Sequence, residues 1–249
     1  MHEQVMIETA DGQCPAHVFT PEGDGPWPAV IFFMDGLGIR QTLFDMGQRM
    51  ADGGYVVLLP DMFYRAGSYP PMDPKEILGG GGGGFREKMG HLFTSIDNRK
   101  ASEDTGAFLA YLDTRSDVKG KKVGTTGYCM GGAMSLWAAG THPDRIAASA
   151  SYHGGNLAFD GELSPHNLAP EMKARVYVAG ADKDDSYPLE MEARLIEALN
   201  GAGVDHVCEI YPGALHGWTM KDFPDPIYNE AAAERHWQTL LGLYDSTLH

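Results

Sequence analysis

The chain has 249 residues, of which 43% are hydrophobic, and this is enough apolar side chain for one large core. Its 34 acidic residues outnumber 19 lysines and arginines, and the formal net charge of −15 argues against binding to nucleic acid or to an anionic membrane surface. No run of about 18 apolar residues predicts a transmembrane helix, and residues 1–8 lack the basic and apolar segments of a signal peptide. Together with three cysteines, which cannot all pair, these features predict a cytoplasmic protein with a single domain over residues 1–249.

Strands and helices alternate along the chain after a hairpin-like start. The strands are predicted at residues 4–8, 16–19, 29–33, 56–59, 122–126, 147–152, 175–179 and 206–211. The helices are predicted at residues 42–53, 100–114, 130–141, 188–202 and 229–246. Because parallel strands need crossover connections, this order predicts an α/β fold with a mainly parallel sheet of about eight strands and helices on both faces.

An unbroken run of glycines occupies residues 79–84, between Leu78 and Phe85. Such a run has maximal backbone freedom and holds no fixed shape by itself. It could be the hinge of a lid that carries Phe85 and Arg86, or a low-complexity insertion or linker. The sequence leaves these alternatives open.

The segment Gly-Tyr-Cys-Met-Gly-Gly at residues 127–132 has the pattern of a nucleophile elbow, with cysteine at the position where serine is usual. The flanking glycines have a steric reason, because the nucleophile sits on a sharp turn between a strand and a helix. The predicted strand at 122–126 and helix at 130–141 supply that context. A thiol at a helix N-terminus is favoured as thiolate, so Cys129 is the candidate nucleophile. The alternative is a structural cysteine beside a glycine-rich turn.

A histidine and three aspartates follow the elbow at places that suit a cysteine nucleophile, which needs a base that is itself oriented by a carboxylate. His216 lies in a glycine-flanked turn after the last predicted strand, and Asp182, Asp184 and Asp185 follow the strand before it. The chain order is therefore nucleophile, acid and histidine, and each of them follows a strand. This is the order of the α/β-hydrolase triad. For His216 the alternative is an ordinary surface or packing histidine.

These segments resemble the dienelactone hydrolase family, the branch of the α/β-hydrolases with a G-x-C-x-G-G elbow and a Cys-Asp-His triad. The similarity covers nearly the whole chain, from residues 28–33 through 58–64 and the elbow to residues 211–217. The resemblance implies the α/β-hydrolase fold and a triad that contains Cys129 and His216.

The triad acid of the family lies in a G-x-x-D-x-x-x-P arrangement. Asp184 precedes Pro188 by four residues but follows Gly180 by four, one more than the arrangement has, and Asp182 follows Gly180 by two. Because Pro188 anchors the next helix, the resemblance favours Asp184 as the acid and keeps Asp182 as the alternative.

The resemblance also implies an acid just before the first oxyanion-hole amide, where it restrains the resting thiol. This chain has Asp35 where the family usually has glutamate, so the carboxylate is one methylene shorter. A turn acid at a strand end is the alternative reading of Asp35. The oxyanion hole is expected to consist of the backbone amides of Gly36 and Met130, because acyl transfer needs fixed donors aimed at the developing negative oxygen.

The resemblance extends only in part to the contacts with the substrate. The family's type enzyme holds its substrate carboxylate with two arginines, and alignment places Arg86 on the first and Met220 on the second. A solvated loop residue is the alternative for Arg86. Tyr64, His153 and Trp218 are further candidates to shape the pocket.

The predicted function is hydrolysis of a lactone or small carboxylic ester through a cysteine acyl-enzyme. No histidine pair has metal-ligand spacing and no G-x-G-x-x-G follows a strand, so neither a metal nor a dinucleotide cofactor is expected. The expected partner is a small-molecule ester or lactone, with no nucleic acid and no membrane. The alternatives are a thioesterase or peptidase with the same triad, and a redox-sensing or ligand-binding relative whose cysteine is not acylated.

Overall fold

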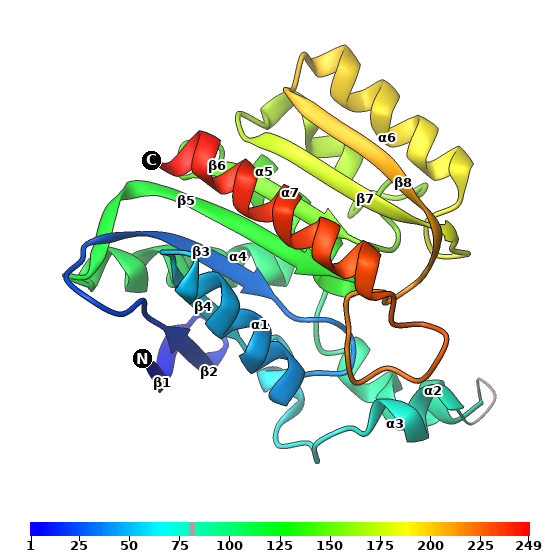
Figure 1. Ribbon diagram of the computed structural model, residues 1–249, viewed down its shortest axis with the longest axis horizontal. Helices are drawn as coiled ribbons and strands as arrows, with labels where there is room; N and C mark the ends of the chain where they lie inside the picture. The colour runs from blue at the N-terminus through cyan, green and yellow to red at the C-terminus, as the bar shows by residue number, and fades with distance from the viewer. Residues whose placement is uncertain (80–82) are drawn as a thin grey trace.

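The computed structural model describes residues 1–79 and 83–249, with side chains described outside residues 79–86. Within these residues one eight-stranded sheet runs through the molecule in the order β1-β2-β4-β3-β5-β6-β7-β8 (Figure 1). The β1–β2 and β2–β4 pairs are antiparallel, and the remaining pairs are parallel. The strands are β1 (His2–Thr9), β2 (Gly12–Phe19), β3 (Trp27–Phe33), β4 (Val56–Pro60), β5 (Val118–Tyr128), β6 (Ile146–Tyr152), β7 (Arg175–Lys183) and β8 (His206–Leu215).

Helices cover both faces of this sheet. Helices α1 and α7 pack on one face, and α4, α5 and α6 lie on the other (Figure 1). The helices are α1 (Gln41–Asp52), α2 (Pro74–Gly79), α3 (Gly83–Phe93), α4 (Asn98–Thr114), α5 (Met130–Thr141), α6 (Leu189–Ala202) and α7 (Glu230–Leu248), with short 3₁₀ turns η1 (Tyr64–Ala66) and η2 (Pro165–Glu171). The prediction of a mainly parallel sheet between two helical layers is confirmed, and the fold is that of an α/β-hydrolase.

The core lies where the central strands are covered on both faces. Residues 29–33 of β3 and 56–59 of β4 have no exposed surface, and both are unbroken apolar runs. Strands buried on both sides need no polar alternation, so such runs are typical of a parallel sheet. This rigid centre fixes the carboxyl ends of the strands, from which the chain turns into its loops.

Several elements differ from the sequence expectation in extent or existence, among them β5, β8, α2 and α3. Strand β5 begins at Val118 and ends at Tyr128, and β8 continues to Leu215, so both reach further than predicted. Helices α2 and α3 were not predicted, because glycine has low helix propensity and masks the pattern around them. The hinge and lid expectation for the glycine run lies outside the described residues, as does the side chain of Arg86.

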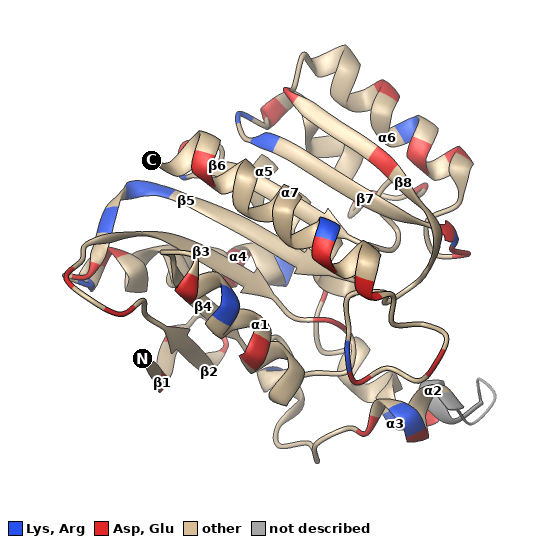
Figure 2. Ribbon diagram, in the orientation of Figure 1, with Lys and Arg blue, Asp and Glu red and all other residues tan. Residues whose placement is uncertain are grey.

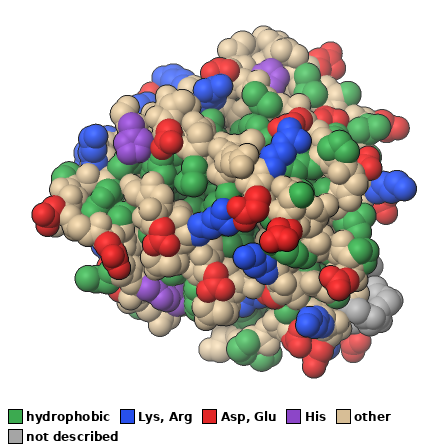
Figure 3. Space-filling view, in the orientation of Figure 1, with side chains coloured by type: hydrophobic (Ala, Val, Ile, Leu, Met, Phe, Trp, Pro, Cys, Tyr) green, Lys and Arg blue, Asp and Glu red, His purple; other side chains and the backbone are tan. Residues whose placement is uncertain are grey.

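Charged residues are spread over helices, strands and loops (Figure 2). On the face shown in Figure 3, acidic and basic side chains of the described residues are interspersed. Among the ion pairs, Arg49 of α1 pairs with Glu234 of α7, and Arg235 of α7 pairs with Glu209 of β8. Among the described residues, no helix combines the length and the apolar composition that a membrane span requires.

Candidate active site

Cys129 occupies a strained turn between β5 and α5. Its φ of 54° and ψ of −116° lie in a region that side-chain-bearing residues rarely adopt. The turn is tight enough to exclude a methyl group on either side: a Cβ on Gly127 would lie 1.8 Å from the Gly131 carbonyl oxygen, and one on Gly131 would lie 2.4 Å from the Phe33 carbonyl oxygen. The glycines of the elbow are therefore required by backbone contacts.

Backbone hydrogen bonds hold the Cys129 turn in place. The Cys129 amide donates to the Tyr152 carbonyl at 3.2 Å, and the Cys129 carbonyl accepts from the amides of Gly132 and Gly155. The side chain thus stands at the N-terminus of α5, where the helix dipole favours a negative charge. Met130 is the first residue of that helix, so its amide belongs to the first turn, which has no partner within the helix.

Strand register brings the other two triad candidates together. Lys183 of β7 pairs with Leu215 of β8, so Asp184 and His216, the next residue in each chain segment, emerge side by side. His216 Nδ1 lies 2.6 Å from Asp184 Oδ2, and the Asp184 side chain is 3% exposed. Asp182, the alternative acid, instead accepts a hydrogen bond from the Gly213 amide. Of the two aspartates, Asp184 is therefore the one that contacts His216.

Ser186 completes the support of Asp184, and the sequence analysis did not identify it. Its hydroxyl and its amide both donate to Asp184 Oδ1, at 2.6 and 2.9 Å. A hydroxyl two residues after an aspartate in a turn is the available signal for such a contact. These bonds leave Asp184 Oδ2 for His216.

The charges of the site raise the pKa of His216 to about 10. Burial alone would lower this pKa, but the charge of Cys129 and hydrogen bonds to Asp184 and Cys129 outweigh it. Burial likewise opposes ionisation of Asp184, whereas the bond to His216 and the His216 charge hold the Asp184 pKa below its usual value. Because Nδ1 is bound to Asp184, Nε2 is the ring nitrogen left for Cys129.

Two cavities meet at the Cys129–His216 pair. Cavity A, of about 330 Å³, has the apolar lining residues Phe93, Ile96, Ala133, Met134, Phe159 and Leu163. Cavity B, of about 280 Å³, is lined by Asp35, Gly36, Leu37, Leu78, His153 and Phe223. Cys129 and His216 are the residues that line both.

The predicted oxyanion-hole residues lie on either side of the nucleophile. Met130 lines cavity A and Gly36 lines cavity B. A Cβ on Gly36 would come within 2.5 Å of the Phe93 ring, so the loop after β3 passes close to α3 at this point. Both predicted residues thus line a cavity that Cys129 also lines.

Asp35 departs from the role that the resemblance implies. It lines cavity B, but its carboxylate makes a two-pronged ion pair with Arg40, at 2.6 and 2.7 Å, and accepts from the Leu37 amide. Arg40 also forms an ion pair, at 2.6 Å, with Asp222, which lies in the chain segment that follows His216. The acid therefore braces the oxyanion loop through Arg40 instead of standing free to restrain the thiol.

His153 is the one aromatic pocket candidate that the structure places in cavity B. It follows Tyr152, which pairs with Tyr128, so it emerges beside Cys129. Its Nε2 contacts the Thr219 hydroxyl at 2.8 Å, and within the described part of the chain its Nδ1 is buried without a partner. Burial holds the pKa of His153 well below 6.5, so this imidazole is neutral.

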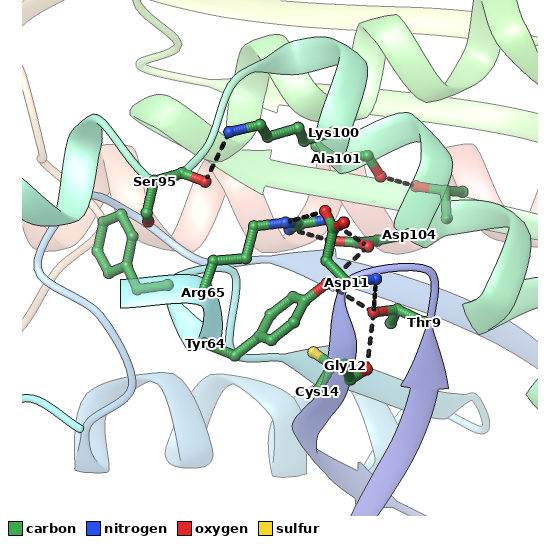
Figure 4. Close-up of polar contacts among 12 residues, drawn as sticks. Thr9, Asp11, Gly12, Cys14, Tyr64, Arg65, Ser95, Lys100, Ala101 and Asp104 are labelled. Carbon is green, nitrogen blue, oxygen red and sulfur yellow. Dashed lines mark hydrogen bonds and ion pairs between the residues drawn. The ribbon is translucent and has the colours of Figure 1, made fainter. Parts of the chain in front are cut away.

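The other two pocket candidates, Tyr64 and Trp218, lie outside the linings of cavities A and B. Tyr64 hydrogen-bonds Thr9 and Asp104, in the polar network that Arg65 joins (Figure 4), and it lines a separate cavity with Asp61. Tyr64 is not among the residues that line cavity A or cavity B.

Trp218 is fully buried, stacked on Tyr211 and edge-on to His153, so it supports the cavity wall from behind. Met220 is also fully buried, and neither residue lines cavity A or B.

Fold and site together define a member of the α/β-hydrolases with a cysteine at the nucleophile elbow. The sequence profile of the dienelactone hydrolase family matches residues 14–248, and the chain belongs to that family.

The relatives are distant in sequence but similar over most of their length. The chain is 26% identical over 242 residues to a Yersinia pestis protein named "Putative carboxymethylenebutenolidase", covering 96% of this chain and 85% of that one. The structure of a "Putative Dienelactone Hydrolase" from Klebsiella pneumoniae superposes with a TM-score of 0.82 at 21% identity, covering 98% of both chains. A dienelactone hydrolase-like promiscuous phosphotriesterase, P91, from metagenomic libraries superposes with a TM-score of 0.75 at 21% identity, covering 100% of this chain and 99% of that one.

No cluster of three or more His, Cys, Asp or Glu side chains suited to a metal ion occurs among the described residues.

Proposed function

We propose that the protein hydrolyses a lactone or small carboxylic ester through a covalent intermediate on Cys129. The observation that supports this most directly is the strained elbow that presents Cys129 to His216, with Asp184 bound to the far side of the imidazole. Nucleophile, base and orienting acid in this arrangement are the parts that acyl transfer requires.

The first half-reaction forms the acyl-enzyme. The Cys129 thiolate attacks the carbonyl carbon, and the negative charge that develops on the carbonyl oxygen is stabilised by the Gly36 and Met130 amides. As the carbon–oxygen bond breaks, protonated His216 donates its Nε2 proton to the departing oxygen. This half leaves a thioester on Cys129 and an alcohol, which departs from an open-chain ester and stays attached to the acyl chain of an opened lactone.

The second half-reaction uses the same residues in reverse. Neutral His216 accepts a proton from water, and the hydroxide oxygen attacks the thioester carbonyl. The carbon–sulfur bond then breaks, releasing the carboxylic acid and returning the thiolate beside protonated His216. Asp184 keeps the imidazole in one orientation through both halves. Every step uses groups of this chain and water, so we propose that no cofactor takes part.

A reducing compartment, the cytoplasm, suits this chemistry because it keeps the nucleophile reduced. The three cysteines of the chain are free thiols in the structure.

The test is turnover of a panel of lactones, nitrophenyl esters and thioesters by wild type, Cys129→Ala and Cys208→Ala. Cys208 is the matched control, because it is half-buried and burial raises its pKa to about 12. We expect Cys129→Ala to lose turnover and Cys208→Ala to keep it, and intact-mass measurement of the wild type to show a transient acyl adduct. Preference for thioesters would favour the thioesterase alternative, and turnover that survives Cys129→Ala would remove Cys129 as the nucleophile.

A further inference from the structure

The two cavities differ in which elements build them. Cavity A lies between the start of α4, the first turns of α5 and the loop that contains Phe159 and Leu163. Cavity B lies between the oxyanion loop, α2 and the loop after β8 that contains Phe223. The cavities share Cys129 and His216, so the reacting atoms lie at the junction of two separate chambers.

An open-chain ester has the shape that this junction accommodates. Its acyl chain and its alkoxy chain leave the carbonyl carbon in different directions, and the carbon that Cys129 attacks lies between them. In a lactone both chains belong to one ring, so they leave on the same side. One chamber would then hold the ring and the other would hold only solvent.

The size and polarity of the chambers suit apolar arms. A water molecule occupies about 30 Å³ of liquid, so the volumes of about 330 and 280 Å³ hold roughly nine to eleven groups of that size each. Leu37, Leu78 and Phe223 make most of cavity B apolar. Asp35, which also lines it, is neutralised by Arg40.

The ionisable groups on the described walls disfavour a negatively charged arm. They are the carboxylates of Asp35 and Asp97, the imidazoles of His153 and His216, and the thiol of the nucleophile Cys129. Asp97 caps α4 by accepting from the Lys100 amide, so it stays in place as an acceptor. His153 is neutral and His216 belongs to the triad.

We infer that the substrate is an uncharged, open-chain ester with two apolar arms, one in cavity A and one in cavity B. This inference rests on the proposed ester hydrolysis and assigns the substrate class of the same site.

The first test uses wild-type protein and straight-chain alkyl alkanoates, in which the acyl chain or the alkoxy chain is lengthened one methylene at a time. Each buried methylene contributes about a three- to fourfold gain in binding, so kcat/KM should rise by up to that factor per methylene in both series until a chamber is full. A lactone with the same number of heavy atoms should be the poorer substrate. A response to only one arm, or a preference for the lactone, overturns the inference.

The second test narrows one chamber at a time. Leu163→Trp adds volume at the wall of cavity A and Leu78→Trp at the wall of cavity B; both leucines are only half-buried, which leaves the larger ring room at the cavity. Each variant should reduce kcat/KM for long chains at least tenfold in one series, acyl or alkoxy, and leave the other series unchanged. The series that is affected should differ between the two variants. Leu189→Trp, at a 68% exposed position on α6, is the control and should change neither series.

Failures of the two proposals can be told apart. Turnover of the shortest ester by wild type, but not by Cys129→Ala, supports the proposed function. This result does not depend on how kcat/KM responds to the length of either arm. If either tryptophan variant fails to fold, Leu163→Phe and Leu78→Phe provide the smaller change. Equal loss in both series from either variant contradicts two separate arm sites.

Discussion

At the scale of the residue, Cys129 differs from the other two cysteines in its surroundings. Burial and the nearby Asp104 and Asp61 raise the pKa of Cys14, and burial and Glu192 raise the pKa of Cys208. Cys129 instead lies at a helix N-terminus beside protonated His216. Thiolate character decides the rates of acylation and alkylation, so reagents for thiolates should label Cys129 first.

Exchanging each aspartate for asparagine should separate the two candidate acids. Asp184→Asn removes the negative charge that orients His216, and we expect kcat to fall by about 10²- to 10⁴-fold. Asp182→Asn changes only an exposed contact to the Gly213 amide, so kcat should stay within about twofold. Steady-state kinetics on one ester compares the variants directly. The opposite ranking would make Asp182 the acid despite its distance from the imidazole.

The raised pKa of His216 predicts a pH-dependent stability. Because the folded-state pKa of about 10 exceeds the ordinary value of 6.5, protonated His216 stabilises the folded protein. That contribution is complete below about pH 6.5 and is lost as the pH rises through about 10. Cys129→Ala removes a charge that raises this pKa, so its stability should fall less over the same range. Urea unfolding at three pH values measures the difference, and parallel curves for the two proteins would contradict it.

At the scale of the element, Arg40 joins two loops that carry functional groups. It is 8% exposed, at the start of α1, and binds Asp35 of the oxyanion loop and Asp222 of the loop that follows His216. Its planar fork meets the Asp35 carboxylate with two parallel bonds, a geometry that lysine cannot reproduce. The amide of Gly36 and the imidazole of His216 are thereby held relative to each other.

Arg40→Met should therefore destabilise the protein and slow catalysis. Leaving Asp35 buried without its partner costs about 3–5 kcal/mol of unfolding free energy, and a displaced oxyanion loop should lower kcat more than it raises KM. Arg49→Met is the control, because its pair with Glu234 is 41% and 46% exposed and is worth at most about 1 kcal/mol. Urea unfolding and ester kinetics give the two readouts. Equal effects from the two variants would deny Arg40 a special role.

The sequence predicted the elements whose signals are local. Apolar runs mark β3 and β4, and the steric demands of the elbow mark Cys129 through its flanking glycines. The fold class follows from the alternation of these elements. Helices α2 and α3 lie beside a glycine run, where propensity gives no signal for them.

The parts that sequence could not predict depend on register and side-chain direction. The contact of Asp184 with His216 follows from the pairing of Lys183 with Leu215, and spacing along the chain does not specify that pairing. The ion pair between Asp35 and Arg40 depends on the path of the loop that follows β3. The hydrogen bond from the Tyr64 hydroxyl to Asp104 likewise joins residues that are far apart in the chain.

At the scale of the whole molecule, the net charge of −15 affects which substrates approach the site. Acidic residues occur on many elements of the ribbon in Figure 2, so their negative field is not confined to one segment of the chain. A neutral ester does not respond to this field. An ester that carries a carboxylate is repelled unless a local cation offsets the repulsion, and Arg86 is the residue that the family resemblance offers for that purpose.

Salt dependence of kcat/KM distinguishes these cases. Raising the ionic strength from about 20 mM to about 200 mM shortens the Debye length from roughly 20 Å to less than 10 Å. For an acidic ester, kcat/KM should then rise severalfold as the repulsion is screened, while the value for a neutral ester of the same length stays level. Arg86→Ala should leave both slopes unchanged. If kcat/KM for the acidic ester instead falls with salt, and Arg86→Ala abolishes that fall, Arg86 is a carboxylate clamp. A positive contact at the site would then outweigh the negative field of the whole chain, and this result would contradict an uncharged substrate.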